Sequence, residues 1–396
     1  MNVARCPGPG VLGARFRAAS QYRLVPIRGL SVRDRERLLA AGSLPRLGGV
    51  LTPEGDAPGD VRVVDRDAAR LFSILRNPSR LPRSVLRMLK GEAARRVAGL
   101  VLDGVLEIEH GDRFLSGVAA RSLCFDRSRW PTGRGRVALL SAAALARAAS
   151  LAGCDSRELA RRLYRFNTVP ASPEWRRLLP TAESVRAFLR FDQLHNPAAV
   201  ERQGSPQSPE AWLAWDSHRS RGIPRSAPTY KLYVSPRGEY LPEALRATLD
   251  LLGRPSGPLA LKVGRDLYGV LRPDKLVAYF RSADDLQDAV RRLVGALDGV
   301  RPQGVPFTAA AVASGLLSWG LDPPASHRPP GWAGGVSWRS WLTHRLAAFL
   351  VAARSAAAAP VRARRFAMDR ASLDGVDPVT WTPTSTVWAD ATSGAG

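Results

Sequence analysis

The sequence predicts an α+β fold with a small N-terminal unit, a helical middle region and a larger C-terminal domain. Residues 44–120 combine short apolar strands with three helical segments and a hairpin. From Tyr230 onward, strand-like and helix-like segments alternate along the chain. The chain has 396 residues, of which 45% are hydrophobic, so it can bury the cores of two or three domains.

The segment 44–120 has the element order of a winged helix, and residues 1–43 before it are expected to form a loose N-terminal arm. Asn77-Pro78 ends the first helix, and Asp103-Gly104 ends the third. Strands are expected at 47–51 and 61–64, helices at 67–76, 81–89 and 93–102, and a wing-like hairpin at 105–109 and 114–115.

A winged helix has two common uses, which are DNA binding through its third helix and peptide binding by an added strand. The segments "VRVVDRDAARLFSILRNPSRLP" and "LVLDGVLEIE" resemble the PqqD-like recognition elements of peptide-modifying enzymes. This resemblance implies capture of a leader peptide. A purely structural winged helix is the third alternative.

The rest of the chain divides by composition. Residues 121–199 are expected to be helical, and the Ser-, Pro- and Gly-rich segment 200–229 is expected to be a linker or mobile loop. An α+β domain follows at 230–376, and an irregular tail at 377–396. Within the domain we expect strands at 230–234, 259–263 and 275–280, and helices at 242–252, 283–297 and 337–354.

Charge and cysteine content indicate which partners and which cellular compartment suit this sequence. The net charge of +23 calls for an anionic partner, but the arginines are spread along the chain rather than gathered in a nucleic-acid-binding stripe. A phosphorylated or acidic peptide satisfies the same charge. Cys6, Cys124 and Cys154 have neither disulfide nor zinc-ligand spacing, which favours a reducing cytoplasm, and no apolar run is long enough to span a membrane.

Lysine is rare in this chain, and its positions are therefore informative. Of 58 Lys and Arg residues only four are lysines, namely Lys90, Lys231, Lys262 and Lys275. Because arginine stays protonated, a lysine retained in so arginine-rich a chain is a candidate general base or nucleophile. A solvated surface lysine is the alternative for each of them.

The order of short motifs in the C-terminal domain resembles a known family. "YKLYV", "LKV", "RPDKLVAYF", "GVPFT", "GLLSWG" and "SWRSW…HRLA" follow one another over residues 228–355. This order is similar to that of the HopA-type effector family, relatives of which serve as the lyase component of class V lanthipeptide and related ribosomal-peptide synthetases.

The resemblance implies elimination of phosphate from phosphoserine or phosphothreonine, leaving dehydroalanine or dehydrobutyrine. The implied partners are a phosphorylated precursor peptide, a separate Ser/Thr kinase-like component and, as an optional partner, a cyclase. Ser337-Trp338-Arg339 only approximates the family's aromatic-glycine-arginine feature. No histidine lies between His218 and His327, so the identity of the general acid is open.

Such an elimination needs a base, a cationic clamp for phosphate and stabilisation of the enolate, but no metal or organic cofactor. Strand alternation puts Lys231 and Tyr233 on one face, where Lys262 on a neighbouring strand could meet them. We expect Lys231 and Lys262 to share the roles of base and enolate stabiliser, and Tyr233 or Tyr279 to be the acid. The expected phosphate ligands are Arg265, Arg272, Lys275, Arg339 and Arg345, whereas Asp274 fits a turn.

Two other functions remain open. The chain could be a non-catalytic scaffold that binds the leader peptide of a synthetase complex, or a winged-helix DNA-binding regulator. A lyase requires Lys231 or Lys262 to meet arginines, whereas a scaffold would show an exposed sheet edge at 47–64. A regulator would need a basic third helix, but residues 93–102 offer only Arg95 and Arg96, which favours a protein that does not bind nucleic acid.

Overall fold

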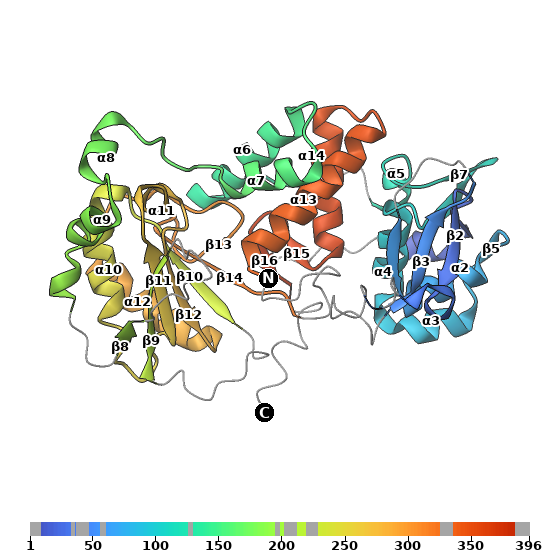
Figure 1. Ribbon diagram of the computed structural model, residues 1–396. Helices are drawn as coiled ribbons and strands as arrows, with labels where there is room; N and C mark the ends of the chain where they lie inside the picture. Colours follow the sequence, from blue (N-terminus) through green and yellow to red (C-terminus); the bar gives the residue numbers. More distant parts are fainter. Residues whose placement is uncertain are drawn as a thin grey trace. The chain divides into compact units, whose positions relative to one another are not determined.

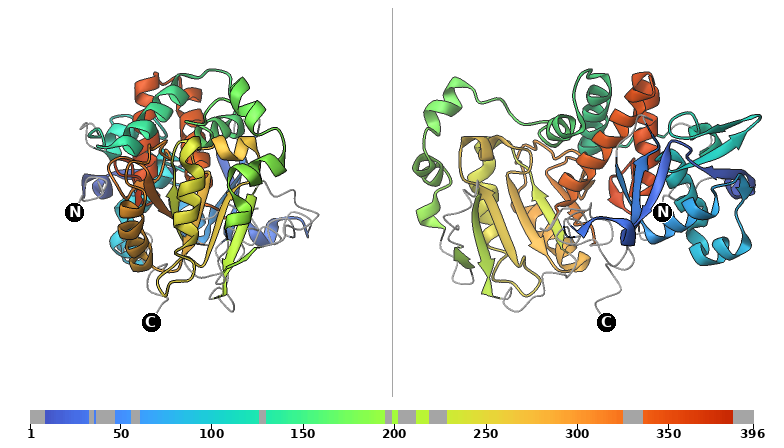
Figure 2. Two further views of the ribbon diagram at one scale, coloured as in Figure 1. Left: turned by 90° about the vertical axis from the view of Figure 1, so that its left-hand side faces the viewer. Right: turned by 45° about the vertical axis from the view of Figure 1, so that its right-hand side comes forward.

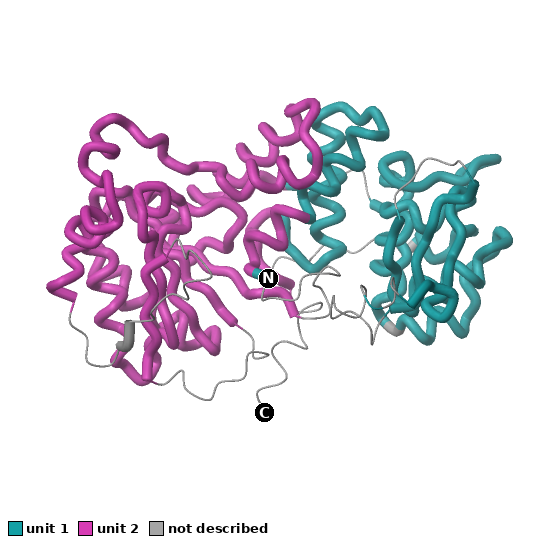
Figure 3. The backbone as a smooth tube through the Cα atoms, viewed as in Figure 1, with its two compact units in different colours: residues 1–130, 325–336, 345–378 teal, residues 131–324, 337–344, 379–396 magenta. Residues whose placement is uncertain are grey.

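The computed structural model describes residues 9–32, 36, 47–55, 61–125, 130–194, 199–201, 212–218, 229–324 and 336–384. Helices and strands are both abundant, which confirms the predicted α+β class (Figure 1). The chain forms two compact units. Unit 1 comprises residues 1–130, 325–336 and 345–378, and unit 2 comprises residues 131–324, 337–344 and 379–396 (Figure 3).

Two antiparallel sheets form the strand framework of unit 1. One has the order β5-β1-β6-β7 and the other the order β2-β3-β4. Their strands are β1 (Arg15–Ala18), β2 (Tyr22–Pro26), β3 (Leu47–Pro53), β4 (Arg62–Asp65), β5 (Ser79–Arg80), β6 (Leu106–His110) and β7 (Arg113–Leu115). The β6–β7 pair is the predicted hairpin, with His110 opposite Arg113.

The expectation of a loose N-terminal arm is corrected for residues 15–26. β1 pairs with β5 and β6, and β2 pairs with β3, so both strands are integral to the sheets of unit 1. Burial of apolar side chains explains why these residues form strands and not a loose arm, because the side chains of Phe16 and Tyr22 are 0% and 5% exposed. Residues 1–8, 33–35 and 37–46 lie outside the described part of the chain.

The helices of unit 1 follow the predicted order closely. Apolar residues at helical spacing form the buried stripes of α2 and α4, as Phe72 and Val97 illustrate. The predicted elements do not include α14, which lies in the same unit. The helices are α2 (Arg66–Ile74), α3 (Arg83–Leu89), α4 (Ala93–Leu102), α5 (Arg121–Cys124) and α14 (Pro360–Leu373).

A seven-stranded antiparallel sheet is the framework of unit 2. Its order is β13-β14-β10-β12-β11-β9-β8. The strands are β8 (Ala199–Glu201), β9 (Trp212–Ser217), β10 (Tyr230–Val234), β11 (Ala260–Gly264), β12 (Leu276–Phe280), β13 (Ala309–Ala310) and β14 (Leu317–Leu321). Two further short strands near the C-terminus are β15 (Val376–Asp377) and β16 (Thr382–Pro383).

The segment expected to be a linker contains a sheet strand. Residues 212–217 form β9, which pairs with β11 so that Lys262 lies opposite Ala214. Leu213 and Trp215 alternate into the core and hold this strand in place. Residues 202–211 and 219–228 lie outside the described residues.

Helices cover one face of the seven-stranded sheet. Leu232, Leu261 and Ala278 point into a core shared with Leu245 and Leu293, which come from two of these helices. Figures 1 and 2 show α10 and α12 along this side of the sheet, with α9 beside α10. The helices of unit 2 are α6 (Arg136–Ser150), α7 (Ser156–Tyr164), α8 (Pro173–Leu178), α9 (Ala182–Phe188), α10 (Leu241–Leu249), α11 (Leu267–Leu271) and α12 (Ala283–Ala296).

Polar side chains fix the beginnings of several of these helices. The carboxylates of Asp155 and Asp266 accept hydrogen bonds from the backbone N–H groups of Glu158 and Gly269. Thr181 and Ser184 form a reciprocal capping box at the start of α9.

Helix α13 (Trp338–Ser355) begins in unit 2, but its residues from 345 onward group with unit 1, so the predicted single domain 230–376 is divided.

Five short 3₁₀ helices complete the described secondary structure: η1 (Pro9–Gly13), η2 (Ile27–Gly29), η4 (Lys90–Glu92), η5 (Phe191–Gln193) and η7 (Gly238–Tyr240). Gly304–Thr308, quoted above as "GVPFT", forms neither helix nor strand. Within the described residues, no helix combines the length and the apolar character needed to cross a bilayer.

Gly320 permits a close approach of β14 to α13. A Cβ atom at this position would lie 2.6 Å from Cδ1 of Trp338, whose side chain is fully buried. We expect Gly320→Ala to lower the free energy of unfolding by about 1–3 kcal/mol, because it overpacks this contact. Urea denaturation measures the change. Gly295→Ala in α12 is the matched control, since nothing lies within 4 Å of its added Cβ, and an equal loss in both variants would contradict the prediction.

Candidate functional site

The face of the seven-stranded sheet that points away from α10 and α12 carries two of the four lysines. In the register of β10, Lys231 lies opposite Tyr279 of β12 and Gly320 of β14. Lys262 of β11 lies opposite Val277 of β12, and Val277 in turn lies opposite Tyr233. Because directly paired residues of an antiparallel sheet share a face, the structure brings both lysines and both tyrosines to one side of the sheet.

Lys262 lies between aromatic rings and other cations. Its Nζ atom is 4.2 Å from the ring centre of Trp212 and 5.8 Å from that of Tyr279. Burial lowers the pKa of Lys262 from 10.5 to about 8, and the charge of Lys231 lowers it further than burial alone would. Among the described residues, no carboxylate forms an ion pair with Lys262. A fraction of this amine is therefore neutral near physiological pH.

Lys231 forms an ion pair with Asp322. Its Nζ atom lies 2.6 Å from Oδ2 of Asp322, and its side chain is only 10% exposed. The same nitrogen is 5.4 Å from the ring centre of Tyr279, so this ring lies near both lysines. Oδ1 of Asp322 accepts a hydrogen bond from the backbone N–H of Trp338, which fixes the carboxylate at the start of α13.

A buried ion-pair cluster adjoins the lysines. Asp274 accepts bonds from Nε and Nη2 of Arg272 at 3.0 Å, and its Oδ2 atom lies 2.7 Å from Nη1 of the fully buried Arg339. The hydroxyl of Tyr164, on α7, donates to the same carboxylate at 2.9 Å. Burial alone would raise the pKa of Asp274, but the two guanidinium groups hold it well below its usual range. We call Asp274, Arg272, Arg339 and Tyr164 the Asp274 cluster.

Arg272 connects the Asp274 cluster with the lysine face. Its guanidinium lies 4.7 Å from the ring centre of Trp212, the ring that also contacts Lys262. The pairing with Asp274 uses Nε and Nη2, and within the described residues Nη1 has no partner. The side chain is 26% exposed, so Nη1 can meet an anion from solution.

Tyr233 and Ser318 form the buried edge of this face. Burial raises the pKa of Tyr233 well above 10, which makes it a poor proton donor. The half-buried Tyr279 lies closer to the lysines and to solvent. The Ser318 Oγ atom, opposite Tyr233, is buried and has no hydrogen-bond partner among the described residues.

Three other sequence-predicted residues lie elsewhere. Lys275 is fully buried, and its Nζ donates to the carbonyl of Pro236 at 2.7 Å and to Gln303 Oε1. Burial lowers its pKa to about 7. Arg265 is exposed, close enough to Glu183 to lower the pKa of that carboxyl, and Arg345 belongs to unit 1, where it pairs with Asp374 at 2.8 Å. The structure therefore brings Arg272 and Arg339, but not these three residues, to the lysine face.

Sequence reasoning missed four contributors to this arrangement. Trp212 was hidden in the presumed linker, although the apolar alternation of "WLAW" could have revealed a strand. Asp274 fitted a turn, and Tyr164 and Asp322 lie far from the lysines in sequence. Only tertiary contacts identify these three. Among the described residues, no group of three or more His, Cys, Asp or Glu side chains could hold a metal ion.

No family model and no curated protein matches this chain. Solved structures similar to it include two effector proteins of Pseudomonas syringae. The effector of pathovar tomato strain DC3000 aligns with a TM-score of 0.39 and 14% identity, over 62% of this chain and 97% of its own. The effector of pathovar syringae strain 61 aligns with a TM-score of 0.39 and 13% identity, over 63% of this chain and 99% of its own.

The Asp274 cluster should be the main polar contributor to the stability of unit 2. Asp274→Asn keeps the shape of the side chain but leaves the buried guanidinium of Arg339 uncompensated. We expect a loss of about 3–5 kcal/mol in the free energy of unfolding, measured by urea denaturation. Asp288→Asn is the control, because the ion-pair partners of Asp288 are the exposed Arg291 and Arg292, beside a hydrogen bond from Ser256, and an equally large effect there would refute the role of the cluster.

The lowered pKa of Lys262 should make stability depend on pH. Between pH 8 and 10.5, the unfolded chain keeps the Lys262 proton that the folded protein has lost, so deprotonation favours the folded state. We therefore expect the free energy of unfolding of the wild type, minus that of Lys262→Met, to increase as pH rises through this window. Arg177→Met is the control, since an exposed arginine does not titrate there; a flat difference for Lys262→Met would contradict the shift.

Proposed function

We propose that this protein is a phosphopeptide lyase. It eliminates phosphate from phosphoserine or phosphothreonine of a ribosomally made precursor peptide and leaves a dehydroamino acid, as in lanthipeptide-type biosynthesis. The observation that carries the proposal is Lys262, a half-buried amine whose pKa is lowered to about 8, beside the cations of Lys231 and Arg272. A base and an anion site are the two parts that the reaction requires.

Lys262 is the proposed general base. Its neutral amine removes the α-proton, and the electrons of that C–H bond form the Cα–Cβ double bond. The bond from Cβ to the phosphate oxygen breaks, and the phosphate leaves with the electron pair. When the ester enters in its singly protonated form, the product is HPO₄²⁻ and the step needs no separate acid. Lys262 then returns its proton to water.

Lys231 and Arg272 are proposed to stabilise charge that develops in this step. Lys231 forms an ion pair with Asp322 at 2.6 Å, so as a fixed cation it suits the enolate oxygen rather than the role of base. Arg272 offers Nη1 to the leaving phosphate, while Asp274 fixes the guanidinium plane through the other two nitrogens. Arg339 is fully buried, so its proposed contribution is to position Asp274 and not to contact phosphate.

Tyr279 is the better placed of the two candidate tyrosines. Its ring lies within 6 Å of both lysine nitrogens, where it can shape the entry for a substrate side chain and donate a proton to a doubly charged phosphate ester. Partners implied by this chemistry are a kinase that supplies the phosphorylated peptide and, as an optional component, a cyclase. The reaction needs no cofactor, and a reducing cytoplasm is the proposed location.

The two alternatives find less support. A leader-binding scaffold is favoured by the sheet order β2-β3-β4, which leaves β4 at an edge where a peptide strand can add. This feature is compatible with a lyase as well. A DNA-binding regulator would need free basic side chains on α4, yet Arg95 pairs with Glu92, and Arg96 lies 2.7 Å from Asp65.

The proposal is tested by incubating the purified protein with a phosphoserine peptide and following its mass. We expect loss of the mass of phosphoric acid at a rate that rises with pH up to about 8, as Lys262 loses its proton. Lys262→Met should slow the reaction by about 10²–10⁴-fold. Lys262→Arg should be equally slow, because arginine keeps the charge but cannot act as a base.

Arg177→Ala, an exposed change on α8, is the control variant and should react at the wild-type rate. A cognate phosphopeptide that binds to wild-type protein and stays chemically unaltered would replace the lyase with the scaffold. A wild-type rate in Lys262→Met would show that another group is the base.

A further inference from the structure

A groove between α6 and α7 has an arginine-rich rim and an apolar floor. Its volume is about 360 Å³, at the lower end of the range for ligand pockets, roughly 300–1,000 Å³. The floor comes from both helices and the turns that follow them, and all of it belongs to unit 2. The rim residues are Arg147, Arg161, Arg162 and Arg165, and the floor residues are Ala144, Ala148, Leu151, Leu163 and Phe166.

The charged residues that line this groove are all basic. No acidic residue is among those that line it. Glu158 neutralises part of the rim from outside, with oxygen atoms 2.7 Å from Arg161 and 2.6 Å from Arg162. Among the described residues, Arg147 and Arg165 have no ion-pair partner and are exposed. A net positive rim therefore remains.

Favourable interaction with helix ends explains part of this charge. Arg147 lies in the last turn of α6, and Arg161 and Arg162 lie in the last turn of α7, where cations are stabilised by the helix dipole. That effect does not require the side chains to converge on one hollow. It also does not account for Arg165, which follows the helix and lines the same groove.

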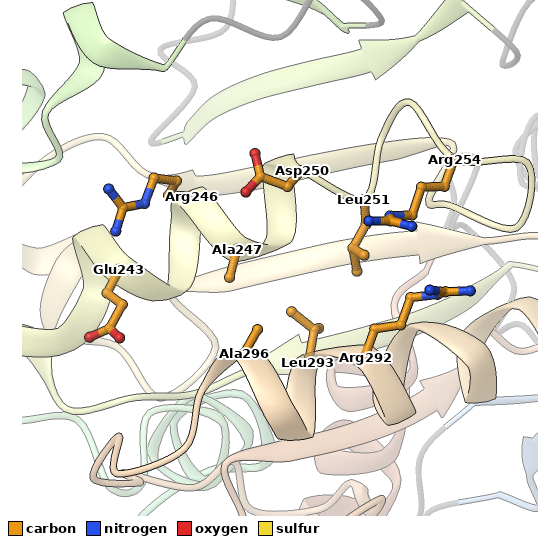
Figure 4. Close-up of a pocket in the computed structure, with 9 residues that line it drawn as sticks. All are labelled: Glu243, Arg246, Ala247, Asp250, Leu251, Arg254, Arg292, Leu293 and Ala296. Carbon is orange, nitrogen blue, oxygen red and sulfur yellow. The ribbon is translucent and has the colours of Figure 1, made fainter.

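A second groove of unit 2 provides a contrast. It lies between α10 and α12 and has a volume of about 480 Å³ (Figure 4). Arg246, Arg254 and Arg292 line it together with Glu243 and Asp250, so its charges are mixed. Figure 4 shows Ala247 and Leu251 on one side of its floor and Leu293 and Ala296 on the other. Acidic residues are thus interleaved with the arginines of the α10–α12 groove, whereas none lines the α6–α7 groove.

We propose that the α6–α7 groove binds an acidic peptide segment. Carboxylates of the segment would pair with Arg147 and Arg165, and its apolar side chains would cover Leu163 and Phe166 on the floor. Nucleic acid fits less well, because a duplex requires a basic surface that follows its backbone, whereas these arginines enclose a compact hollow. The apolar floor would then stay uncovered.

The groove lies next to the candidate active site along α7. Leu163 and Arg165 line the groove, and Tyr164 between them donates to Asp274 at 2.9 Å. The groove and the Asp274 cluster thus use neighbouring residues of the same segment. The role of the groove as a second contact for the same peptide substrate rests on the proposed function. Binding of a peptide in the groove does not itself depend on chemistry at Lys262.

Fluorescence anisotropy tests the groove directly. The probe is a labelled peptide in which glutamates flank two leucines, and the protein is the full chain. We expect the double variant Arg147→Glu, Arg165→Glu to bind about tenfold more weakly than the wild type. Both positions are exposed and lack ion pairs among the described residues, so the fold should persist, as circular dichroism can verify.

The matched control changes the net charge equally at exposed arginines elsewhere, through Arg177→Glu and Arg362→Glu. It should keep wild-type affinity. An equal loss in both double variants would overturn the proposal, because the attraction would then come from net charge alone. Two further results would also overturn it. One is a peptide with serines in place of the leucines that binds the wild type as tightly as the probe does. The other is a nucleic acid that displaces the probe and binds the groove variant more weakly than the wild type.

These outcomes are separable from the lyase test. Loss of peptide binding in the groove variant, with phosphate elimination still measurable at a saturating peptide concentration, supports the groove as a docking surface. Elimination that fails in every variant while the peptide still binds in the groove rejects the lyase and leaves the groove intact.

Discussion

The buried pairing of Asp274 with Arg272 and Arg339 is the interaction on which the proposed site depends. A carboxylate and a fully buried guanidinium are stable in this interior only because each compensates the other. The pairing joins the turn before β12 to the start of α13, and Tyr164 extends it to α7. Three segments far apart in the sequence are thereby held around one face of the sheet.

The two faces of the seven-stranded sheet carry different kinds of side chains. One face is covered by helices and contributes Leu232 and Leu261 to the core of unit 2. The other carries Lys231, Lys262 and Tyr279, and both lysine side chains contact aromatic rings there. Alternation along each strand produces this division, because successive residues point to opposite faces.

The two lysines differ because their surroundings differ. Asp322 keeps Lys231 paired, whereas Lys262 has an aromatic neighbour, Trp212, and the repulsion of nearby cations. Desolvation and like charge both favour the neutral amine of Lys262, so the proposed distinction between a base and a fixed cation arises from these neighbours. The α6–α7 groove of the same unit is likewise lined by arginines, without an acidic residue in its lining.

The sequence alone determined the α+β class, the strand Tyr230–Val234, the helix Ala93–Leu102 and the shared face of Lys231 and Tyr233, because each of these follows from local periodicity. Tertiary structure decided what periodicity does not encode. It placed residues 15–26 and 212–217 in sheets, moved Lys275 into the interior, and separated Arg265 and Arg345 from the lysines. It also chose the partners of each charge, since Asp274 meets Tyr164 and Arg339 only after distant segments pack together.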